Sequence, residues 1–283
     1  MATFVVPQAV PLPAEDAAAL LRAFQGWGTD EQTVITILAH RDASQRKQIL
    51  LEYEQKYNES LIQRLRSELS GDFEHAMYHW ILDPAERQAV MANAATICIQ
   101  EDYPVIIEIA CSNSSAELLE VKKAYHVLYQ RSLEEDVAVH SSGNLRGFLL
   151  ALVSIYRYEG DIVDTRLAKS EAKVLHEAIK NGTTDHDELI RIVGTRSKAQ
   201  LDATFSCFRD EHGTSITKIL RNATRESGTD EDSLTRVVVM HAEKNMKDIS
   251  DAFQKRSSCT LEQAIAKETS GYYRTFLMAL LGS

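Results

Sequence analysis

The chain is poor in the residues that interrupt helices. It has only twelve glycines and five prolines among 283 residues, whereas a chain of many short strands needs turn residues more often. None of its four cysteines belongs to a CxxC pair, which argues against a disulfide framework and a structural zinc site. The longest apolar run has about ten residues, and a membrane-spanning helix needs roughly 20.

Positive charge is also scarce, because the chain has 31 Lys and Arg but 41 Asp and Glu, which gives a net charge of −10. Binding to nucleic acid rests on basic side chains against phosphates, so we expect no nucleic-acid partner. An anionic membrane should repel the chain as well, unless some local feature reverses the sign. The opening MATFVVPQAVPLP has no basic region of a secretory signal. We therefore expect a soluble protein of the cytoplasm.

Helical periodicity is what the sequence does contain. Apolar residues recur at spacings of three and four in residues 31–38, 45–57 and 61–69. This spacing is typical of amphipathic helices that turn one face inward. The sequence predicts an all-α chain of short helices joined by tight polar turns.

The chain also repeats itself. An offset of 200 residues aligns Gly28–Glu31 with Gly228–Glu231 and Glu68 with Glu268. Offsets of 72 and 155 reveal two further copies; the first aligns Tyr53 with Tyr125. Self-similarity at such periods indicates an array of one supersecondary unit, here in four copies.

The copies are unevenly spaced. The offsets of 72, 155 and 200 give successive steps of 72, 83 and 45 residues. A step of 45 is too short for a unit of about 70, so roughly 30 residues are missing, which equals about two helices. The end of the third unit and the first helix of the fourth are the expected losses. A helical array with lost helices leaves apolar faces uncovered, so we expect distortion or exposed apolar surface at residues 215–225.

A glycine-rich loop precedes the helix expected at residue 31. Gly26 and Gly28 permit backbone angles that turn carbonyl oxygens outward, and Thr29 with Gln32 reads as a capping box. Glu68 follows forty positions after Gly28, just before a Ser-Gly turn. Carbonyl oxygens completed by a carboxylate suit Ca²⁺. The alternative is that the loop and the turn are merely helix caps.

The second and third copies, which differ from the first at these positions, help to decide between a calcium site and helix caps. The second copy has Gln100 where the first has Gly28, and His140 where the first has Glu68. The third copy has Thr183 at the loop position, and Ala223 at the acid position. The loop and the distant acid are lost together, which favours a joint role over separate caps.

With these motifs the chain resembles the annexin family. The pattern GxGTDE, with an acid before a Ser-Gly turn, carries the resemblance, and the stretches 132–136, 167–173 and 187–193 are similar to its plant branch. The resemblance implies an all-α array of four repeats of five helices in a curved disc, here with a truncated third repeat and with helix A of the fourth largely missing. The implied parts are an N-terminal tail at 1–12 and repeats at 13–83, 84–158, 165–221 and 222–283.

The resemblance also implies the function: Ca²⁺-dependent binding to anionic phospholipid membranes without catalysis, at the membrane periphery when calcium rises, with possible roles in stress response. The implied calcium ligands are Phe24, Gly26, Gly28 and Glu68 in the first repeat and Thr224, Glu226, Gly228 and Glu268 in the fourth. Glu226 stands where the family has its first glycine, so the first site is the more trusted. Trp27, between two glycines, is the expected membrane contact because indole suits the membrane interface.

Other motifs support alternative readings more weakly. His40 has been linked with peroxidase-like activity in the family, and Glu268–Gly271 resembles a short nucleotide-hydrolysis motif. Ile190–Ile192 matches a tripeptide proposed for actin binding, which is weak support for actin as a partner. His75 and His79 have metal-clip spacing, but we expect ordinary helix-surface histidines. A further alternative is a variant impaired by the loss of about two helices.

Overall fold

The computed structural model describes residues 1–26, 28–97, 102–154, 157–181, 186–212, 231–255, 257 and 259–282. Every helix or strand assigned within these ranges is an α-helix, seventeen in all. The helices form two compact units, residues 1–87 with 228–283, and residues 88–227. The all-helical fold predicted from the sequence is confirmed.

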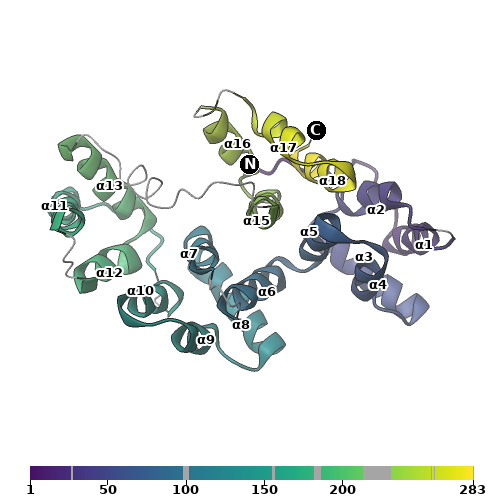
Figure 1. Cartoon of the computed structure of the whole chain (residues 1–283), viewed down its shortest axis with the longest axis horizontal. Coiled ribbons are helices and arrows are strands. Elements are labelled where there is room, and N and C mark those ends of the chain that lie inside the picture. Colours follow the sequence, from purple (N-terminus) through teal and green to yellow (C-terminus); the bar gives the residue numbers. More distant parts are fainter. Residues whose placement is uncertain are drawn as a thin grey trace. The chain divides into compact units, whose positions relative to one another are not determined.

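The first unit brings together the two ends of the chain (Figure 1). Its helices are α1 (Pro13–Ala23), α2 (Glu31–Leu38), α3 (Ala43–Tyr57), α4 (Leu61–Glu68), α5 (Gly71–Ile81), α15 (Glu231–His241), α16 (Met246–Gln254), α17 (Leu261–Glu268) and α18 (Gly271–Leu281). Helices α2 and α5 contact α18, and α5 also contacts α15. One buried core that includes Leu20, Ile35, Trp80, Val238 and Leu280 runs through these helices. The first and fourth repeats therefore fold around a shared core.

The internal repeat extends to the backbone conformation at helix ends. Asn58 ends α3 in the left-handed region at φ 51°. Gln130, 72 residues later, ends α8 (Ser115–Tyr129) in the same region at φ 56°. The following helices, α4 and α9 (Leu133–His140), both begin after a serine whose side chain accepts a backbone N–H, as an N-cap does. The offset found in the sequence thus aligns equivalent structural positions.

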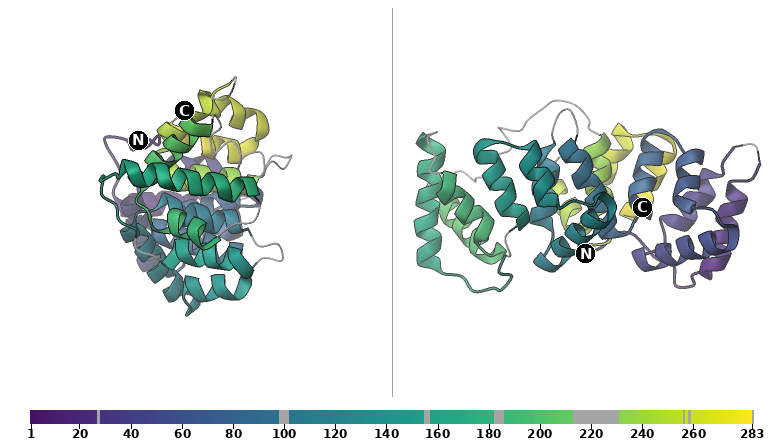
Figure 2. Two further views of the ribbon diagram at one scale, coloured as in Figure 1. Left: turned by 90° about the vertical axis from the view of Figure 1, so that its left-hand side faces the viewer. Right: turned by 90° about the horizontal axis from the view of Figure 1, so that it is seen from below.

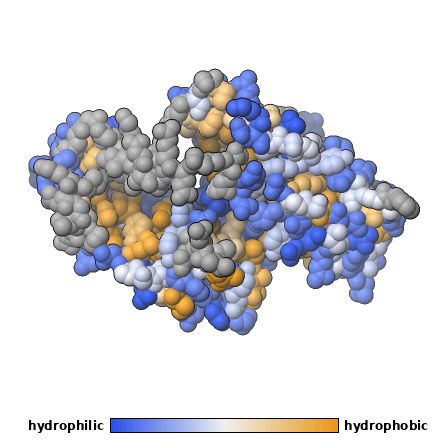
Figure 3. Space-filling model, in the orientation of Figure 1, coloured by the Kyte–Doolittle hydropathy of each residue, from blue (hydrophilic) through white to orange (hydrophobic). Residues whose placement is uncertain are grey.

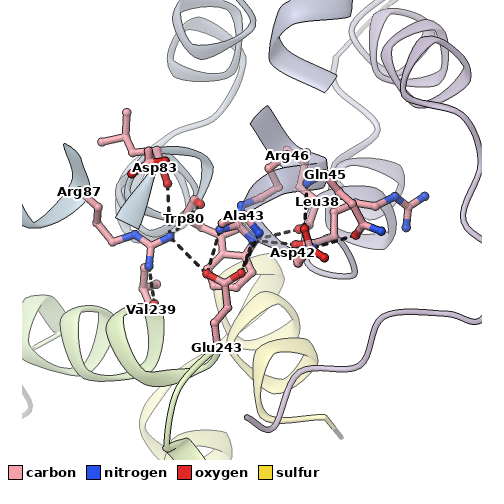
Figure 4. A network of polar contacts seen from close by, with 12 residues as sticks. Leu38, Asp42, Ala43, Gln45, Arg46, Trp80, Asp83, Arg87, Val239 and Glu243 are labelled. Atoms are coloured by element: carbon pink, nitrogen blue, oxygen red, sulfur yellow. Dashed lines mark hydrogen bonds and ion pairs between the residues drawn. The ribbon is translucent and has the colours of Figure 1, made fainter. Parts of the chain in front are cut away.

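A buried charged network ties the fourth repeat to the first (Figure 4). The Arg46 guanidinium lies 3.8 Å from the ring centre of Trp80 and pairs with Glu243 at 3.1 Å. Arg87 donates to the Val239 carbonyl at 2.8 Å. Burial lowers the pKa of Arg46, and the negative charge of Glu243 partly offsets this by raising it. Burial also lowers the pKa of Arg87, to about 9. Glu243 thus supplies negative charge that two buried guanidinium groups need.

The second unit holds most of α6 (Pro84–Ile97) and the helices α7 (Tyr103–Ser112), α8, α9, α10 (Gly143–Ser154), α11 (Thr165–Asn181), α12 (His186–Thr195) and α13 (Lys198–His212). Helix α11 packs against α12 and α13 around buried Leu175, Ile192 and Phe208 (Figure 2). Residues 213–230 lie outside the described ranges, and with them the distortion expected at 215–225 and the place of the fourth repeat's first helix.

Candidate metal centre

The loop between α1 and α2 has the conformation that its glycines were expected to allow. Gly26 has φ 123° and Gly28 has φ 89°, which are angles that residues with a Cβ rarely adopt. A Cβ built on either glycine would meet no atom within 4 Å. These glycines are therefore required by the path of the backbone and not by crowding.

Asp30, and not Thr29, caps the helix after the loop. The Asp30 carboxylate accepts the Thr33 backbone N–H at 3.0 Å and the Thr33 hydroxyl at 2.7 Å. These hydrogen bonds hold the pKa of Asp30 below its ordinary value. The prediction of a capping box on Thr29 and Gln32 was wrong by one residue, because the helix begins at Glu31 and Asp30 is therefore its N-cap residue.

Freed from capping, Thr29 contacts the distant acid. Its hydroxyl donates to Glu68 Oε2 at 2.6 Å, across 39 positions of the chain. Glu68 is the last residue of α4, and the turn into α5 follows it. The loop and the acid that vary together among the copies are therefore joined by a direct hydrogen bond.

Arg64 lies between two of the predicted calcium ligands. Its Nη2 donates to the Phe24 carbonyl at 3.2 Å and lies 3.0 Å from Glu68 Oε1. A positively charged nitrogen thus occupies a point that a backbone oxygen and a carboxylate oxygen both face. The two oxygens thus face one positive charge, and oxygens of these two kinds are also donors that Ca²⁺ takes in proteins.

The surroundings of Glu68 are negatively charged. Glu31, Glu68 and Asp72 line one hollow of about 260 Å³ together with Ser70 and Ser270. Tyr273 lines it too, and its pKa is raised first by burial and further by Asp72, Glu231 and Asp232. This field attracts cations.

The corresponding place in the fourth repeat is described only on its acid side. Glu268 ends α17, and Gly271 begins α18 at φ 61°, the same angle as Gly71 at the start of α5. Ala264 takes the place of Arg64, and Lys267 Nζ lies 3.6 Å from Glu268 Oε1. Thr224, Glu226 and Gly228, the other predicted ligands, lie outside the described residues, as does Trp27 of the first loop.

The second repeat has His140 at the position of Glu68. The hydroxyl of Tyr103, the first residue of α7 and the counterpart of Glu31, donates to the backbone carbonyl of His140 at 2.7 Å. His140 Nδ1 lies 2.9 Å from the Asp136 carbonyl of its own helix. With imidazole in place of carboxylate, this position offers no negative charge for calcium.

The residues of the alternative readings have ordinary contacts. His40 Nδ1 lies 3.1 Å from the Thr36 carbonyl, one turn earlier in the chain. Arg191, in the predicted actin tripeptide, pairs with Glu188 at 2.6 Å and with Glu171 at 3.4 Å. Burial raises the pKa of the Cys111 thiol, which disfavours a reactive thiolate.

The expectation for the two histidines of α5 needs correction. His75 is partly exposed, but only 5% of His79 is accessible. His79 is therefore a core residue and not a surface one. The sequence-based view missed this because it did not take account of α15, which packs against α5.

Sequence reasoning also missed Arg64. The signal was present, because Arg64 precedes Glu68 by four residues on a predicted helix, and such residues are neighbours on a helix face. Its second contact, to Phe24, is forty positions away and depends on the tertiary fold.

The face shown in Figure 3 is mostly hydrophilic over α1 to α4. No helix in the described ranges is long and apolar enough to cross a membrane.

The four copies agree with the comparisons to known proteins. The family model described as Annexin matches residues 15–80, 88–152, 170–225 and 217–280. The chain belongs to the annexin family. Annexin-like protein RJ4 of Fragaria ananassa is 48% identical over 312 residues, with 100% of this chain and 99% of the relative covered. Annexin D2 of Arabidopsis thaliana is 45% identical over 313 residues at the same coverage.

The annexin fold is equally clear among solved structures. Annexin III matches with a TM-score of 0.89 at 30% identity, covering 100% of this chain and 97% of that chain. The alignment to Annexin-like protein RJ4 spans 312 positions against 283 residues here, a difference of 29. This difference agrees with the roughly 30 residues that the internal spacing predicts to be missing.

Proposed function

We propose that this annexin binds Ca²⁺ in its first repeat and thereby attaches to anionic phospholipid membranes. The carbonyl oxygens of Phe24, Gly26 and Gly28 and the carboxylate of Glu68 are the proposed ligands. The observation that carries the proposal is the position of Arg64 Nη2, within 3.2 Å of the Phe24 oxygen and 3.0 Å of a Glu68 oxygen. Oxygen donors of these two kinds are those that Ca²⁺ takes in proteins.

The net charge explains why an ion is needed. With a charge of −10, the chain and an anionic lipid surface repel each other. A calcium ion held by loop carbonyls and one carboxylate keeps coordination positions for a lipid phosphate and reverses the local sign. Attachment is therefore peripheral, switched on by calcium at the cytoplasmic face of membranes, and reversed by a chelator. The proposed role is binding, without a catalytic step.

Two residues of the first repeat influence the calcium concentration at which this site fills. Thr29 holds Glu68 against the loop through the 2.6 Å hydrogen bond. Arg64 neutralises Glu68 in the absence of calcium and has to release it when the carboxylate turns to the ion. Arg64 therefore raises the calcium concentration at which the site fills, and Thr29 lowers it.

A second site, with Thr224, Glu226, Gly228 and Glu268 as ligands, is proposed for the fourth repeat. Support comes from Glu268, which precedes a Ser-Gly turn with the same glycine φ as in the first repeat. Ser227 at the tip of this loop cannot insert into lipid as Trp27 can. We assign the larger share of membrane affinity to the first repeat.

The test is co-sedimentation of the full chain with phosphatidylserine vesicles, at stepped calcium concentrations and with EGTA. We expect pelleting only with calcium, and none with phosphatidylcholine vesicles. Glu68→Gln should need more calcium than Glu268→Gln. A larger effect at Glu268 would reverse the ranking of the two sites.

Folded wild-type protein that stays in the supernatant at all calcium concentrations would contradict the proposal. That result would favour the alternative in which the shortened third repeat has abolished membrane binding. Circular dichroism on the same samples establishes that each variant is folded.

A further inference from the structure

A pair of imidazoles lies in the first unit, outside the proposed calcium ligands. His75 and His79 are four residues apart on α5, and their Nε2 atoms lie 3.0 Å from each other. The ring centres are 4.5 Å apart and the ring planes meet at 83°. Both side chains therefore direct the same ring nitrogen toward one point.

The fourth repeat orients the outer imidazole of this pair. His75 Nδ1 lies 3.4 Å from Asp232 Oδ1, at the start of α15. A carboxylate this close to Nδ1 favours a proton on that nitrogen, which leaves the Nε2 lone pair available. In metalloproteins the same carboxylate–imidazole contact orients histidine ligands and makes them more basic.

The imidazole of His79, the inner residue of the pair, makes fewer hydrogen bonds than its two ring nitrogens allow. His79 is buried, and its Nδ1 has no hydrogen-bond partner. Among the residues that the structure describes, the contact between the two Nε2 atoms is the one hydrogen bond of its ring. A metal ion on Nε2 would leave Nδ1 as it is, so the observation that bears on an ion is the 3.0 Å approach of the two Nε2 atoms.

We propose that His75 and His79 bind a divalent transition-metal ion through their Nε2 atoms, with Asp232 as a positioning residue for His75. Metal–nitrogen bonds are about 2.0–2.1 Å long. Two nitrogens 3.0 Å apart then subtend roughly 94° at the ion, close to the right angle of square-planar or octahedral coordination. A small opening of the pair reaches the tetrahedral angle of Zn²⁺.

The donor atoms determine the class of ion. Imidazole nitrogen suits Zn²⁺, Cu²⁺ and Ni²⁺, whereas Ca²⁺ and Mg²⁺ take oxygen ligands. Within the described residues no three His, Cys, Asp or Glu side chains are grouped around one point. Water fills the remaining positions, and the side chain of His75, 41% exposed, leaves room for it. The inference is independent of the proposed calcium site.

An ion on this pair stabilises the contact between two repeats. His75 and His79 belong to α5 of the first repeat, and Asp232 belongs to α15 of the fourth. Because the ion binds the folded arrangement and not the unfolded chain, it should raise the melting temperature of the protein.

The test uses the full chain, stripped with EDTA, dialysed into calcium-free buffer and titrated with ZnCl₂ alone. We expect a melting temperature higher by about 2–4 °C at saturation. In ¹⁵N-histidine spectra, the Nε2 signals of His75 and His79 should shift together at one equivalent. Isothermal calorimetry gives the affinity.

Three variants make the test specific. His75→Gln, at the partly exposed position, should weaken zinc binding at least tenfold, and Asp232→Asn should weaken it about tenfold, as loss of an outer-shell partner does. His40→Gln, which changes a histidine of the same unit that lies apart from the pair, should leave the affinity unchanged. Should the buried substitution His79→Gln unfold the protein, His75→Gln still decides the outcome. Equal zinc affinity of wild type and His75→Gln, or no shift of the two Nε2 signals, would overturn the proposal.

Discussion

The first and second repeats close their loops with the same backbone hydrogen bond but surround them with different chemistry. The Asp30 N–H donates to the Ala23 carbonyl at 2.9 Å, and the Asp102 N–H donates to the Ala95 carbonyl at 3.1 Å. These pairs are 72 residues apart, the offset of the internal repeat. The base of the loop therefore folds in the same way whether or not calcium ligands follow.

The differences lie in the side chains above this shared base. The first repeat joins Thr29 to the Glu68 carboxylate, whereas the second joins Tyr103 to the His140 backbone carbonyl. The first contact connects the loop with the end of α4, and the second connects the first residue of α7 with the end of α9. Only the first contact involves a carboxylate. The comparison teaches that the annexin fold does not depend on the residues proposed as ligands, which is why we propose a function for them in the first repeat.

The largest expected effect comes from removing the acid of the first repeat. Glu68→Gln removes the charge and keeps the shape, and a hydrogen-bonded charge is worth about 1.5–3 kcal/mol. We expect the calcium concentration for half-maximal vesicle binding to rise about tenfold or more. The matched substitution His140→Gln in the second repeat should leave it unchanged. Similar shifts in both variants would show that the two repeats do not differ in function.

A smaller effect of opposite sign is expected from the competing guanidinium. Arg64 and Glu68 are both partly exposed, and ion pairs of this kind contribute about 0.2–1 kcal/mol. Arg64→Gln should lower the half-maximal calcium concentration about two- to fivefold. Arg66→Gln, on the same helix but paired with Glu74, is the control and should have no effect. A higher calcium requirement in Arg64→Gln would mean that Arg64 supports the site.

Loss of the positioning hydrogen bond should have a modest effect. Thr29→Val keeps the size of the side chain and removes the donor to Glu68, a change of about 0.5 kcal/mol at a partly buried hydroxyl. The half-maximal calcium concentration should rise about twofold, and Thr29→Ser should restore it. An unchanged value in Thr29→Val would show that Glu68 needs no support from the loop.

No effect is expected when only the acid is added to the second repeat. His140→Glu provides a carboxylate, but Gln100 stands at the position of Gly28 and the loop lacks both glycines. Vesicle binding by His140→Glu in a Glu68→Gln background should therefore match that of Glu68→Gln alone. Recovery of binding would contradict the requirement for loop and acid together.

The fold could be predicted from the sequence because its signals are local and repeated. Residues 31–38 form α2 within the predicted bounds, and residues 61–69 match α4 to within one residue. The pairing of the loop with Glu68 could be inferred because both change together among the copies. Covariation inside one chain reports on contacts that periodicity alone does not show.

The remaining features depend on tertiary contacts that no local pattern encodes. Thr29 and Asp30 are both good N-cap residues, and the path of the loop decides that Thr29 turns to Glu68 instead. His79 is buried on α5, a helix that packs against α3, α4, α15 and α18, two of them from the other end of the chain. The bond from Arg64 to Phe24 requires that α4 approach the end of α1. These contacts arise only when the repeats are assembled.

The most direct measurement is a crystal structure of the protein grown with calcium, with the ions located by anomalous scattering. We predict an ion in the first loop, at about 2.3–2.6 Å from the carbonyl oxygens of Phe24, Gly26 and Gly28 and from both carboxylate oxygens of Glu68, with Arg64 turned away. A loop without an ion at saturating calcium, and with the pair of Arg64 and Glu68 intact, would contradict the proposed site.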